Sequence, residues 1–339
     1  MTTSMLGPPT TIASLSRSPD PVVTAVVVTH RSAGTVGRCL AATDAALADL
    51  GAPGELLVVL DAPSAEVRAH VAASSARVFE TPHNVGFAAA AMVGVEAARG
   101  EWVLLLNDDV LLEPEAVARM LKTGSSARDI GAVAPQIRFE RARNLINSAG
   151  LAVDALGVAS ERLVGAAVTT ADEPQDVFGA SGTAALYRVH MLREVGGFDE
   201  RFFAYYEDAD LAWRARMRGW RCVYEPTAIV YHDHSATLGH ESPRKHYLVG
   251  RNRVRTLAKN ATGAHLLRFG PAIVAYELAY VAFVAFASQT LAPLRGRLRG
   301  LAEWRTFRRV GAAGRRAVDL DERGGIRHAL ARRRAYRAK

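Results

Sequence analysis

The chain has 339 residues, of which 49% are hydrophobic and 22% are charged, so it can bury one large core or two modest ones. This composition excludes disorder over the whole length. The two cysteines, Cys39 and Cys222, are too few and too far apart in sequence for a disulfide framework or a closed zinc site. We therefore expect a reducing compartment, with the cytoplasm as the default.

The net charge of +8 is concentrated at the C-terminus. Residues 295–339 carry fifteen Lys and Arg residues against four acids. This asymmetry predicts that the C-terminus contacts an anionic membrane surface, and it argues against nucleic acid as a partner of the main domain. A solvated basic helix and an RNA-binding tail are the alternatives.

Residues 1–20 are rich in Ser, Thr and Pro and lack the apolar run of a signal peptide, so we expect a disordered tail. A β-branched run over 22–29 predicts a buried strand, and helical spacing of apolar residues follows over 35–50. The same pattern predicts strands over 56–60, 77–80 and 102–106, with Ala-rich helices between them. This alternation predicts a doubly wound α/β sheet whose ligands gather at the carboxyl ends of its strands.

The apolar pattern weakens over 138–175, where we expect a loop-rich excursion that contains a hairpin. It returns over 178–187 and is followed by a predicted helix over 208–218 and a predicted strand over 221–231. We expect the globular domain to occupy residues 21–263.

Residues 264–339 form the predicted C-terminal region of apolar and basic helices. Its apolar stretch over 272–294 contains only Glu277 and Gln289 as interruptions and is long enough to cross a bilayer. A single crossing would place the basic tail outside, against the bias of Lys and Arg toward the cytoplasmic side. A helix that lies in the membrane plane or inserts shallowly avoids this conflict. The alternative is a helical hairpin packed on the domain or on a second subunit, which would make a homo-oligomer.

Acidic residues follow the predicted strand over 102–106. Asn107, Asp108 and Asp109 stand at the tip of that strand, where oxygen ligands face the crevice and can bind a divalent cation. Mg²⁺ or Mn²⁺ held there would bridge a diphosphate and neutralise the charge on a departing nucleotide. Capping of the next helix is the alternative interpretation.

A second acidic group lies at the start of the predicted helix over 208–218. Glu207, Asp208 and Asp210 are close together there, and the first turn of a helix favours anions. The aromatic residues before them, which include Phe203 and Tyr206, can wall a sugar pocket and leave one carboxylate as a general base. Simple helix capping is again the alternative.

Three histidines, His232, His234 and His240, follow the predicted strand over 221–231. Neutral imidazole suits Mn²⁺ and protonated imidazole suits phosphate, although a single histidine in such a place is more often structural.

Several segments, taken in chain order, resemble those of a known family: VVVTHRS, NVGFAAA, LLNDDV, GGFDERFFAYYEDADLAWR and YHDHS. They resemble the family 2 glycosyltransferases of GT-A fold, and within them the bacterial rhamnosyltransferase-like branch. The resemblance runs from about Val22 to Asn260. It implies an inverting, metal-dependent enzyme at the cytoplasmic face of the plasma membrane. Such an enzyme would move a sugar, with rhamnose favoured, from a nucleotide diphosphate sugar to a cell-envelope glycan or polyprenyl-diphosphate-linked acceptor.

The resemblance also implies roles for individual residues. Asp109 and His232 would bind the metal, with His234 as a competing ligand. Asp208 would deprotonate the acceptor hydroxyl, with Glu207 beside it. The residues implied to bind the nucleotide sugar are Thr29, Arg31, Asp61, Asn84, Gly86, Phe87, Asn107 and Asp108. Those implied to bind the acceptor are Gly182, Phe203, Tyr206, Asp210 and Arg214.

The chain departs from the family pattern after the second predicted strand. Relatives commonly have D-N-x-S there, whereas this chain has Asp61, Ala62, Pro63 and Ser64, which leaves the contact with the nucleobase open. Two rival functions are a GT-A scaffold without activity and a nucleotidyltransferase. The second would need a Gly-rich, basic loop after the first strand, and THRSAGT matches that poorly.

Overall fold

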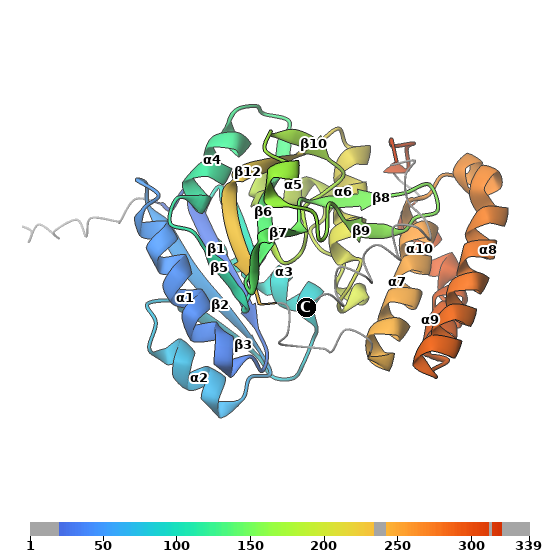
Figure 1. Cartoon of the computed structure of the whole chain (residues 1–339), viewed down its shortest axis with the longest axis horizontal. Coiled ribbons are helices and arrows are strands. Elements are labelled where there is room, and N and C mark those ends of the chain that lie inside the picture. The colour runs from blue at the N-terminus through green and yellow to red at the C-terminus, as the bar shows by residue number, and fades with distance from the viewer. Residues whose placement is uncertain (1–19, 234–241, 312–313, 321–339) are drawn as a thin grey trace, which may run out of the picture.

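Four parallel strands form one half of the central sheet in the computed structural model, which describes residues 20–233, 242–311 and 314–320 (Figure 1). They are β1 (Val23–Thr29), β2 (Gly54–Asp61), β3 (Arg77–Thr81) and β4 (Trp102–Asn107). The helices α1 (Ala33–Ala48), α2 (Ala65–Ala72) and α3 (Phe87–Ala97) connect them. β1 lies between β2 and β4, so the four predicted strands and their parallel pairing are confirmed.

The other half of the sheet mixes strand directions, in the overall order β10-β12-β6-β11-β4-β1-β2-β3. β11 (Ala184–Arg188) is antiparallel to both β4 and β6 (Ile130–Phe139), whereas β12 (Arg221–His232) is parallel to β6. The short strand β5 (Val110–Leu112) pairs with the end of β12. This pairing brings the tip of β4 and the tip of β12 to the same edge of the sheet.

The region over 138–175 contains more strand than its sequence pattern indicates. β7 (Ala142–Ser148) folds back on β6, and β8 (Leu151–Val153) pairs with β9 (Ala159–Glu161) in a separate two-stranded sheet. A short 3₁₀ helix, η1 (Val168–Thr170), and the edge strand β10 (Gln175–Val177) complete the region. These strands are three to seven residues long, too short for clear alternation of apolar and polar residues.

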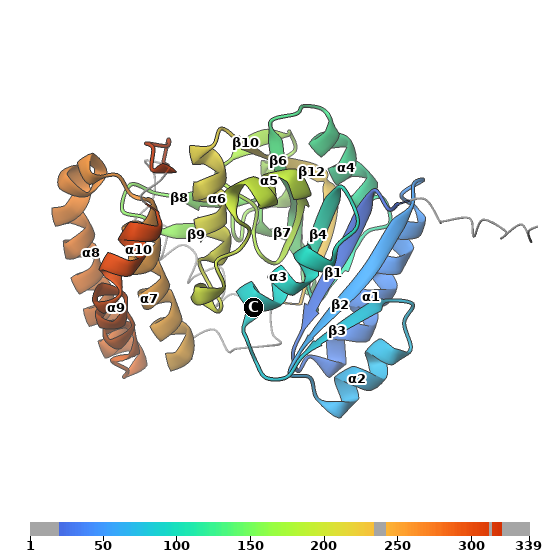
Figure 2. The same cartoon turned by 180° about the vertical axis from the view of Figure 1, so that it is seen from behind.

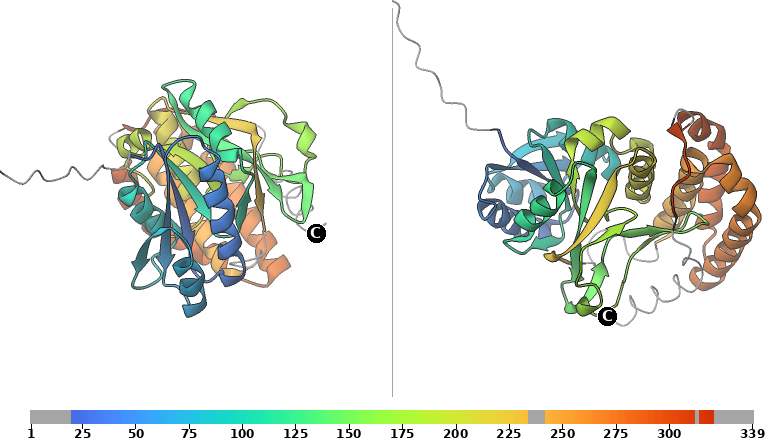
Figure 3. Two further views of the ribbon diagram at one scale, coloured as in Figure 1. Left: turned by 90° about the vertical axis from the view of Figure 1, so that its left-hand side faces the viewer. Right: turned by 90° about the horizontal axis from the view of Figure 1, so that it is seen from above.

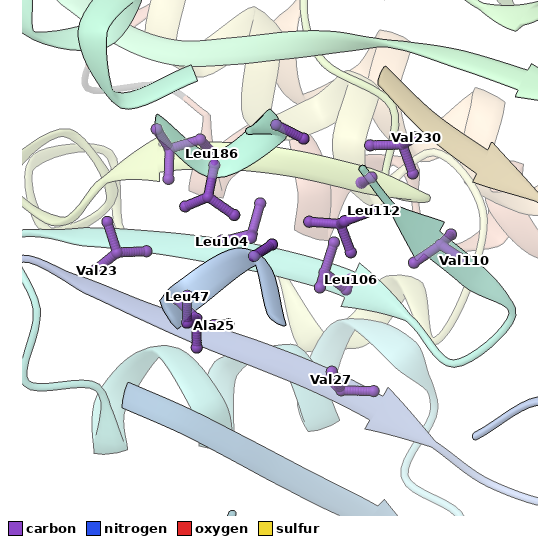
Figure 4. Close-up of a cluster of buried hydrophobic side chains, with 14 of the residues drawn as sticks. Val23, Ala25, Val27, Leu47, Leu104, Leu106, Val110, Leu112, Leu186 and Val230 are labelled. Carbon is purple, nitrogen blue, oxygen red and sulfur yellow. The ribbon is translucent and has the colours of Figure 1, made fainter. Parts of the chain in front are cut away.

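Side-chain alternation along the strands divides the core between the two faces of the sheet. On one face, Val23, Ala25 and Val27 of β1 pack against α1, α2 and α4 (Ala116–Ser125), as Figure 4 shows for part of this cluster. On the other face, Val26 and Val28 pack with α3, α5 (Val189–Val195) and α6 (Glu207–Met217), which follows the 3₁₀ helix η2 (Glu200–Phe202). Figure 2 views the molecule from behind and shows this second face of the sheet. Each fully buried Val or Leu contributes about 1.5–3 kcal/mol to stability.

A layer of helices stands beside the sheet (Figure 3). It consists of α7 (Pro243–Asn260), α8 (Gly263–Ser288), α9 (Ala292–Ala302) and α10 (Trp304–Val310). The apolar stretch over 272–294 is divided between two helices, because Gln289 adopts a left-handed conformation (φ 49°) at the end of α8. α8 is the one described helix that is long and apolar enough to cross a membrane by length and composition, with a mean hydropathy of 1.7. Its Glu277 forms ion pairs with Arg253 of α7 and Arg297 of α9.

α7 and α9 approach each other closely because glycines line their contact. A Cβ atom at Gly296 would lie 2.1 Å from the carbonyl oxygen of Tyr247, and one at Gly300 would lie 2.8 Å from that of Arg251. These neighbours are backbone atoms and cannot rotate away. The close packing of α7 on α9 therefore requires glycine at both positions.

Gly296→Ala should destabilise the protein by about 1–3 kcal/mol, since the added methyl group forces α9 away from α7. The matched control is Gly34→Ala in α1, where a Cβ atom would meet nothing within 4 Å. Denaturant unfolding of both variants measures the difference. Equal stability of the two variants would contradict the close α7–α9 contact.

Candidate active site

The pairing of β5 with β12 brings two predicted metal ligands together. Val110 lies opposite His232 in this pairing, so Asp109 stands beside the histidine, with its Oδ1 3.3 Å from His232 Nε2. His232 Nδ1 donates a hydrogen bond to Asn147 Oδ1 at 2.9 Å. In the neutral tautomer that this bond favours, Nε2 would carry a lone pair toward Asp109, as is usual for metal-binding histidines.

The donor atoms of this pair suit a divalent cation. Asp109 Oδ1 is buried and accepts no hydrogen bond from any described residue, and it lies 3.3 Å from His232 Nε2. A cation is the natural partner of such a pair. Within the described ranges there is no cluster of three or more His, Cys, Asp or Glu side chains arranged to hold a metal. Two protein ligands match Mg²⁺ or Mn²⁺ sites that are completed by substrate phosphates and water.

Asp108 lies beneath the metal-ligand pair and is 6% exposed. Burial raises its pKa to about 6, and the neighbouring charge of Asp109 adds to this increase, while the hydroxyls of Thr29 and Ser32 oppose it. Thr29 is itself buried at the end of β1. The predicted donor-site residues Thr29 and Asp108 are therefore brought together at one edge of the sheet.

Asp61 organises the loop that precedes α3. Its Oδ1 accepts hydrogen bonds from Thr81 Oγ1 and the amide of Val85, both at 2.8 Å, and its Oδ2 accepts one from the amide of Gly86 at 3.1 Å. Asn84 Nδ2 lies 3.1 Å from His30 Nε2, which follows β1. Asp61 thus fixes residues 84–86 beside the end of β1, and its contact with the ribose stays a prediction.

The loop before α6 packs directly on the loop before α3. The amide of Ala88 donates to the carbonyl of Phe203 at 3.0 Å. Gly86 has φ of 87°, and a Cβ atom there would lie 2.5 Å from the ring of Phe203. Phe203 therefore lies at the junction of the predicted donor and acceptor sites. Arg31 is exposed at the same end of the sheet.

Asp208, at the start of α6, is positioned by two backbone amides. Its Oδ2 accepts from Gly182 at 3.0 Å and its Oδ1 from Ala209 at 2.7 Å. Burial raises the pKa values of both Asp208 and Glu207, and that of Glu207 is raised further by the charge of Asp208. A carboxylate with a raised pKa is a stronger base, as acceptor deprotonation requires.

Residues 181–183, the bridging segment, connect Asp208, the predicted base, to β4, which precedes the predicted metal ligand Asp109. Gly182 contacts Asp208, and the carbonyl of Thr183 accepts from the amide of Asn107 at 3.0 Å. A Cβ atom at Gly182 would lie 3.4 Å from Glu207 Oε1 and 3.6 Å from the ring of Phe87. A side chain at Gly182 would therefore stand between Phe87 and the two carboxylates.

Glu161 is a site residue that the sequence did not reveal. Its Oε1 accepts from Ser181 Oγ of the bridging segment at 2.9 Å, and its Oε2 accepts from Ser148. Burial raises its pKa to about 7, and the charge of Asp208 adds to that increase. Glu161 belongs to a three-residue strand in the region of weak pattern, so nothing in its sequence surroundings distinguishes it from an ordinary surface acid.

Three residues expected to bind the acceptor are turned into the protein. Asp210 is fully buried, and its carboxylate accepts from Arg214 and Lys259 at 2.8 Å. Arg214 also donates to the carbonyl oxygens of Val195 and Gly197. The hydroxyl of Tyr206 accepts from the amide of Ala159 at 3.2 Å. We therefore assign structural roles to Asp210, Arg214 and Tyr206 in place of acceptor contact.

The competing metal ligand His234 and the third histidine, His240, lie outside the described residues, as do residues 1–19 and the basic tail beyond residue 320. The domain boundaries at residues 20 and 263 stay predictions.

Residues 19–247 match the family described as "Glycosyltransferase like family 2", and the chain belongs to that family. Among similar proteins, the N-acetylglucosaminyl-diphospho-decaprenol L-rhamnosyltransferase of Mycobacterium tuberculosis is 34% identical over 159 residues, which are 43% of this chain and 51% of that protein. The pre-mycofactocin glycosyltransferase of the same species is 28% identical over 222 residues, 65% of this chain and 46% of that protein. The chain thus spans about half the length of these relatives.

Two solved structures show the fold. GalNAc-T7 with UDP, GalNAc and Mn²⁺ has a TM-score of 0.59 at 14% identity, over 86% of this chain and 58% of that one. The mannosyltransferase PcManGT from Pyrobaculum calidifontis, with GDP-Man and Mn²⁺, has a TM-score of 0.50 at 18% identity, over 94% and 81% of the two chains. The expected α/β fold of GT-A type is confirmed.

Glu161 should make the protein less stable as the pH rises from its ordinary pKa of 4.5 to about 7. In that window the folded protein keeps a proton that the unfolded chain releases, so rising pH favours unfolding. Glu161→Gln removes this titration. Unfolding measurements should show equal stability at pH 4 to 4.5 and a variant more stable by up to about 3 kcal/mol above pH 7.

The matched control is Glu80→Gln, because Glu80 is an exposed acid whose pKa is lowered by Arg68. This control should gain no stability with rising pH. A parallel pH dependence of the wild type and Glu161→Gln would contradict the buried setting of Glu161.

Proposed function

We propose that this protein is an inverting glycosyltransferase that uses a nucleotide diphosphate sugar and a divalent cation. One observation carries the proposal: Asp109 Oδ1 and His232 Nε2 lie 3.3 Å apart, and the bridging segment ties the partly buried Asp208 to the same edge of the sheet. A metal-ligand pair beside a base is what glycosyl transfer requires. The solved structures of similar fold contain Mn²⁺ and nucleotides or nucleotide sugars, which supports the choice of ligands.

In this mechanism Asp208 takes the proton of an acceptor hydroxyl, and the resulting oxygen attacks the anomeric carbon of the donor. The bond from that carbon to the diphosphate breaks on the opposite face, so the configuration inverts. A divalent cation held by Asp109 and His232 would neutralise the charge that develops on the diphosphate. Burial of Asp208 beside Glu207 raises its pKa and strengthens it as a base.

We propose a deoxyhexose such as rhamnose as the transferred sugar and a polyprenyl-diphosphate-linked glycan as the acceptor. One Mycobacterium tuberculosis relative, the N-acetylglucosaminyl-diphospho-decaprenol L-rhamnosyltransferase, supports both choices. Thr29, Asp108, Asn84, Gly86 and Phe87 would form the donor site, and Asn107 would complete it at the tip of β4. Gly182 and Phe203 would face the acceptor, because Gly182 contacts Asp208 and Phe203 belongs to the loop that leads into α6.

The purified protein should release nucleoside diphosphate from one nucleotide sugar of a panel when Mg²⁺ or Mn²⁺ is present. Asp208→Asn should lower turnover by about 10²–10⁴-fold and leave metal-dependent binding of the diphosphate intact, because it removes the base alone. Asp109→Asn should lose both, because it removes a metal ligand. Product analysis by chromatography and binding by calorimetry measure the two effects.

Asp176→Asn is the control. Asp176 lies on the exposed edge strand β10, where it pairs with Arg221 of β12, so its substitution should leave turnover unchanged. If no donor is turned over and calorimetry finds no metal-dependent binding of diphosphates, the protein is better described as a GT-A scaffold without activity than as an enzyme. Incorporation of nucleotide in place of sugar would indicate a nucleotidyltransferase.

We also propose that α8 and α9 contact an anionic membrane surface on its cytoplasmic side. Exposed leucines follow one face of α9 at helical spacing, and α8 carries further exposed apolar residues. Exposed arginines lie beside them. We call this set the interfacial surface: Leu267, Val274, Leu278, Phe286, Leu294, Leu298 and Leu301, with Arg268, Arg295 and Arg299.

This combination is typical of helices that lie at a membrane interface, with apolar side chains among the acyl chains and basic side chains at anionic headgroups. Leu267 is 85% exposed and Phe286 is 84% exposed, so water covers large apolar side chains in the isolated protein. A polyprenyl-linked acceptor would also present its sugar at such a surface. Glu277 is paired with Arg253 and Arg297 on the side of α8 toward the protein, which leaves the outer side apolar.

The protein should sediment with phosphatidylglycerol vesicles and only weakly with phosphatidylcholine vesicles, and added salt should reduce binding. The double variant Leu298→Glu/Leu301→Glu should bind at least about tenfold less, because two apolar side chains no longer enter the membrane. Val78→Glu is the matched control, as Val78 is 46% exposed on β3, away from the helical layer. The basic tail is intact in every variant, so equal binding by the double variant and the wild type would assign attachment to the tail and contradict this surface.

A further inference from the structure

The loop between η2 and α6 has an unusual backbone. Phe203, Tyr205 and Tyr206 have φ angles of 68°, 68° and 71°, a region that residues other than glycine rarely adopt. Such conformations persist only where the surrounding structure fixes them, and they concentrate at functional sites. Tyr206 immediately precedes Glu207 and Asp208, so the loop sets where α6, the helix that carries Asp208, begins. We call residues 202–206 the base loop.

Two neighbouring side chains of α7 hold the base loop: Arg251 Nη2 donates to the carbonyl oxygen of Phe202 at 2.8 Å, and Asn252 makes the larger set of contacts. Asn252 is fully buried, and its Nδ2 donates to the carbonyl oxygens of Phe202 and Ala204 at 2.8 Å and of Tyr205 at 2.7 Å. Its Oδ1 accepts from Arg251 Nε at 3.0 Å, which fixes the orientation of the amide. Three carbonyl groups of the base loop therefore converge on one amide group, which shares its two N–H donors among them.

The base loop connects two parts of the candidate site. Its Phe203 carbonyl accepts from Ala88 at the start of α3, while its last residue begins the helix that carries Asp208. The loop before α3 has separate support, because Asp61 holds the amides of Val85 and Gly86. Loss of the Asn252 contacts would therefore displace Asp208 and leave the predicted donor site largely in place.

We propose that Asn252 is a positioning residue for sugar transfer, which holds the base loop in the conformation that places Asp208 at the acceptor. This proposal rests on the proposed function. Asn252 acts through the loop and touches neither substrate nor metal. A merely structural role for Asn252 would lower stability without a selective effect on the chemical step.

Asn252→Ala is the direct test, and Asn260→Ala is its matched control. Asn260 is also buried on α7 and donates its Nδ2 to Asp210 Oδ1 at 2.9 Å, without contact to the base loop. Hydrogen–deuterium exchange should be at least about tenfold faster over residues 202–208 in Asn252→Ala, and close to wild type there in Asn260→Ala. This comparison requires no turnover.

Kinetics provide the second readout. Asn252→Ala should lower kcat by about 10²-fold while KM for the donor and metal-dependent diphosphate binding change little, because displacement of a catalytic group affects the chemical step. Asn252→Asp, which keeps the shape and loses the donor, should behave like Asn252→Ala. Asn252→Ser keeps one donor and should recover part of kcat, and it also serves as the test if the alanine variant does not fold.

Equal exchange over residues 202–208 in Asn252→Ala and Asn260→Ala would overturn the proposal, and so would faster exchange with an unchanged kcat. A rise in KM for the donor with kcat preserved would also overturn it, since that result would place the effect at the donor site. If the wild-type protein turns over no donor, the proposed function fails, and the exchange comparison still decides whether Asn252 holds the base loop.

Discussion

The pairing of β5 with β12 determines where the candidate site forms. β5 follows Asp109 after a sharp change of direction at the tip of β4, and its antiparallel pairing with β12 places Val110 opposite His232. A shift of this register by one residue would turn the histidine to the other face of the sheet, because strand side chains alternate. The approach of the two predicted metal ligands depends on this register, whereas the bridging segment is held at the same edge by Asn107 and by the pairing of β11 with β4.

Two carboxylates in the first turn of α6 have opposite electrostatic settings. Asp210 is surrounded by Arg214, Lys259 and Asn260, which lower its pKa despite complete burial. Asp208 accepts hydrogen bonds from two backbone amides, and burial raises its pKa. Environment, and not residue type, therefore separates a carboxylate that stabilises the fold from one that is suited to act as a base.

The helical layer is joined to this chemistry through α7. One side of α7 supplies Asn252 and Lys259 to the loop and helix around Asp208, and the other side packs on the glycines of α9. α8 and α9 carry the interfacial surface on their outer side. The proposed membrane contact and the base are thus linked by one helix whose side chains are buried over most of its second half.

The sequence by itself determined the α/β sheet, the order of its first four strands and the acidic and histidine positions, because β-branched runs, helical spacing and ordered motifs are local signals. It also indicated Asp109, His232 and Asp208 through their motifs. Only the tertiary structure decided that Asp210 and Arg214 are neutralised in the interior, that Glu161 reaches the bridging segment, and that Asn252 holds the base loop. Those facts depend on contacts between segments far apart in the chain, which local patterns do not encode.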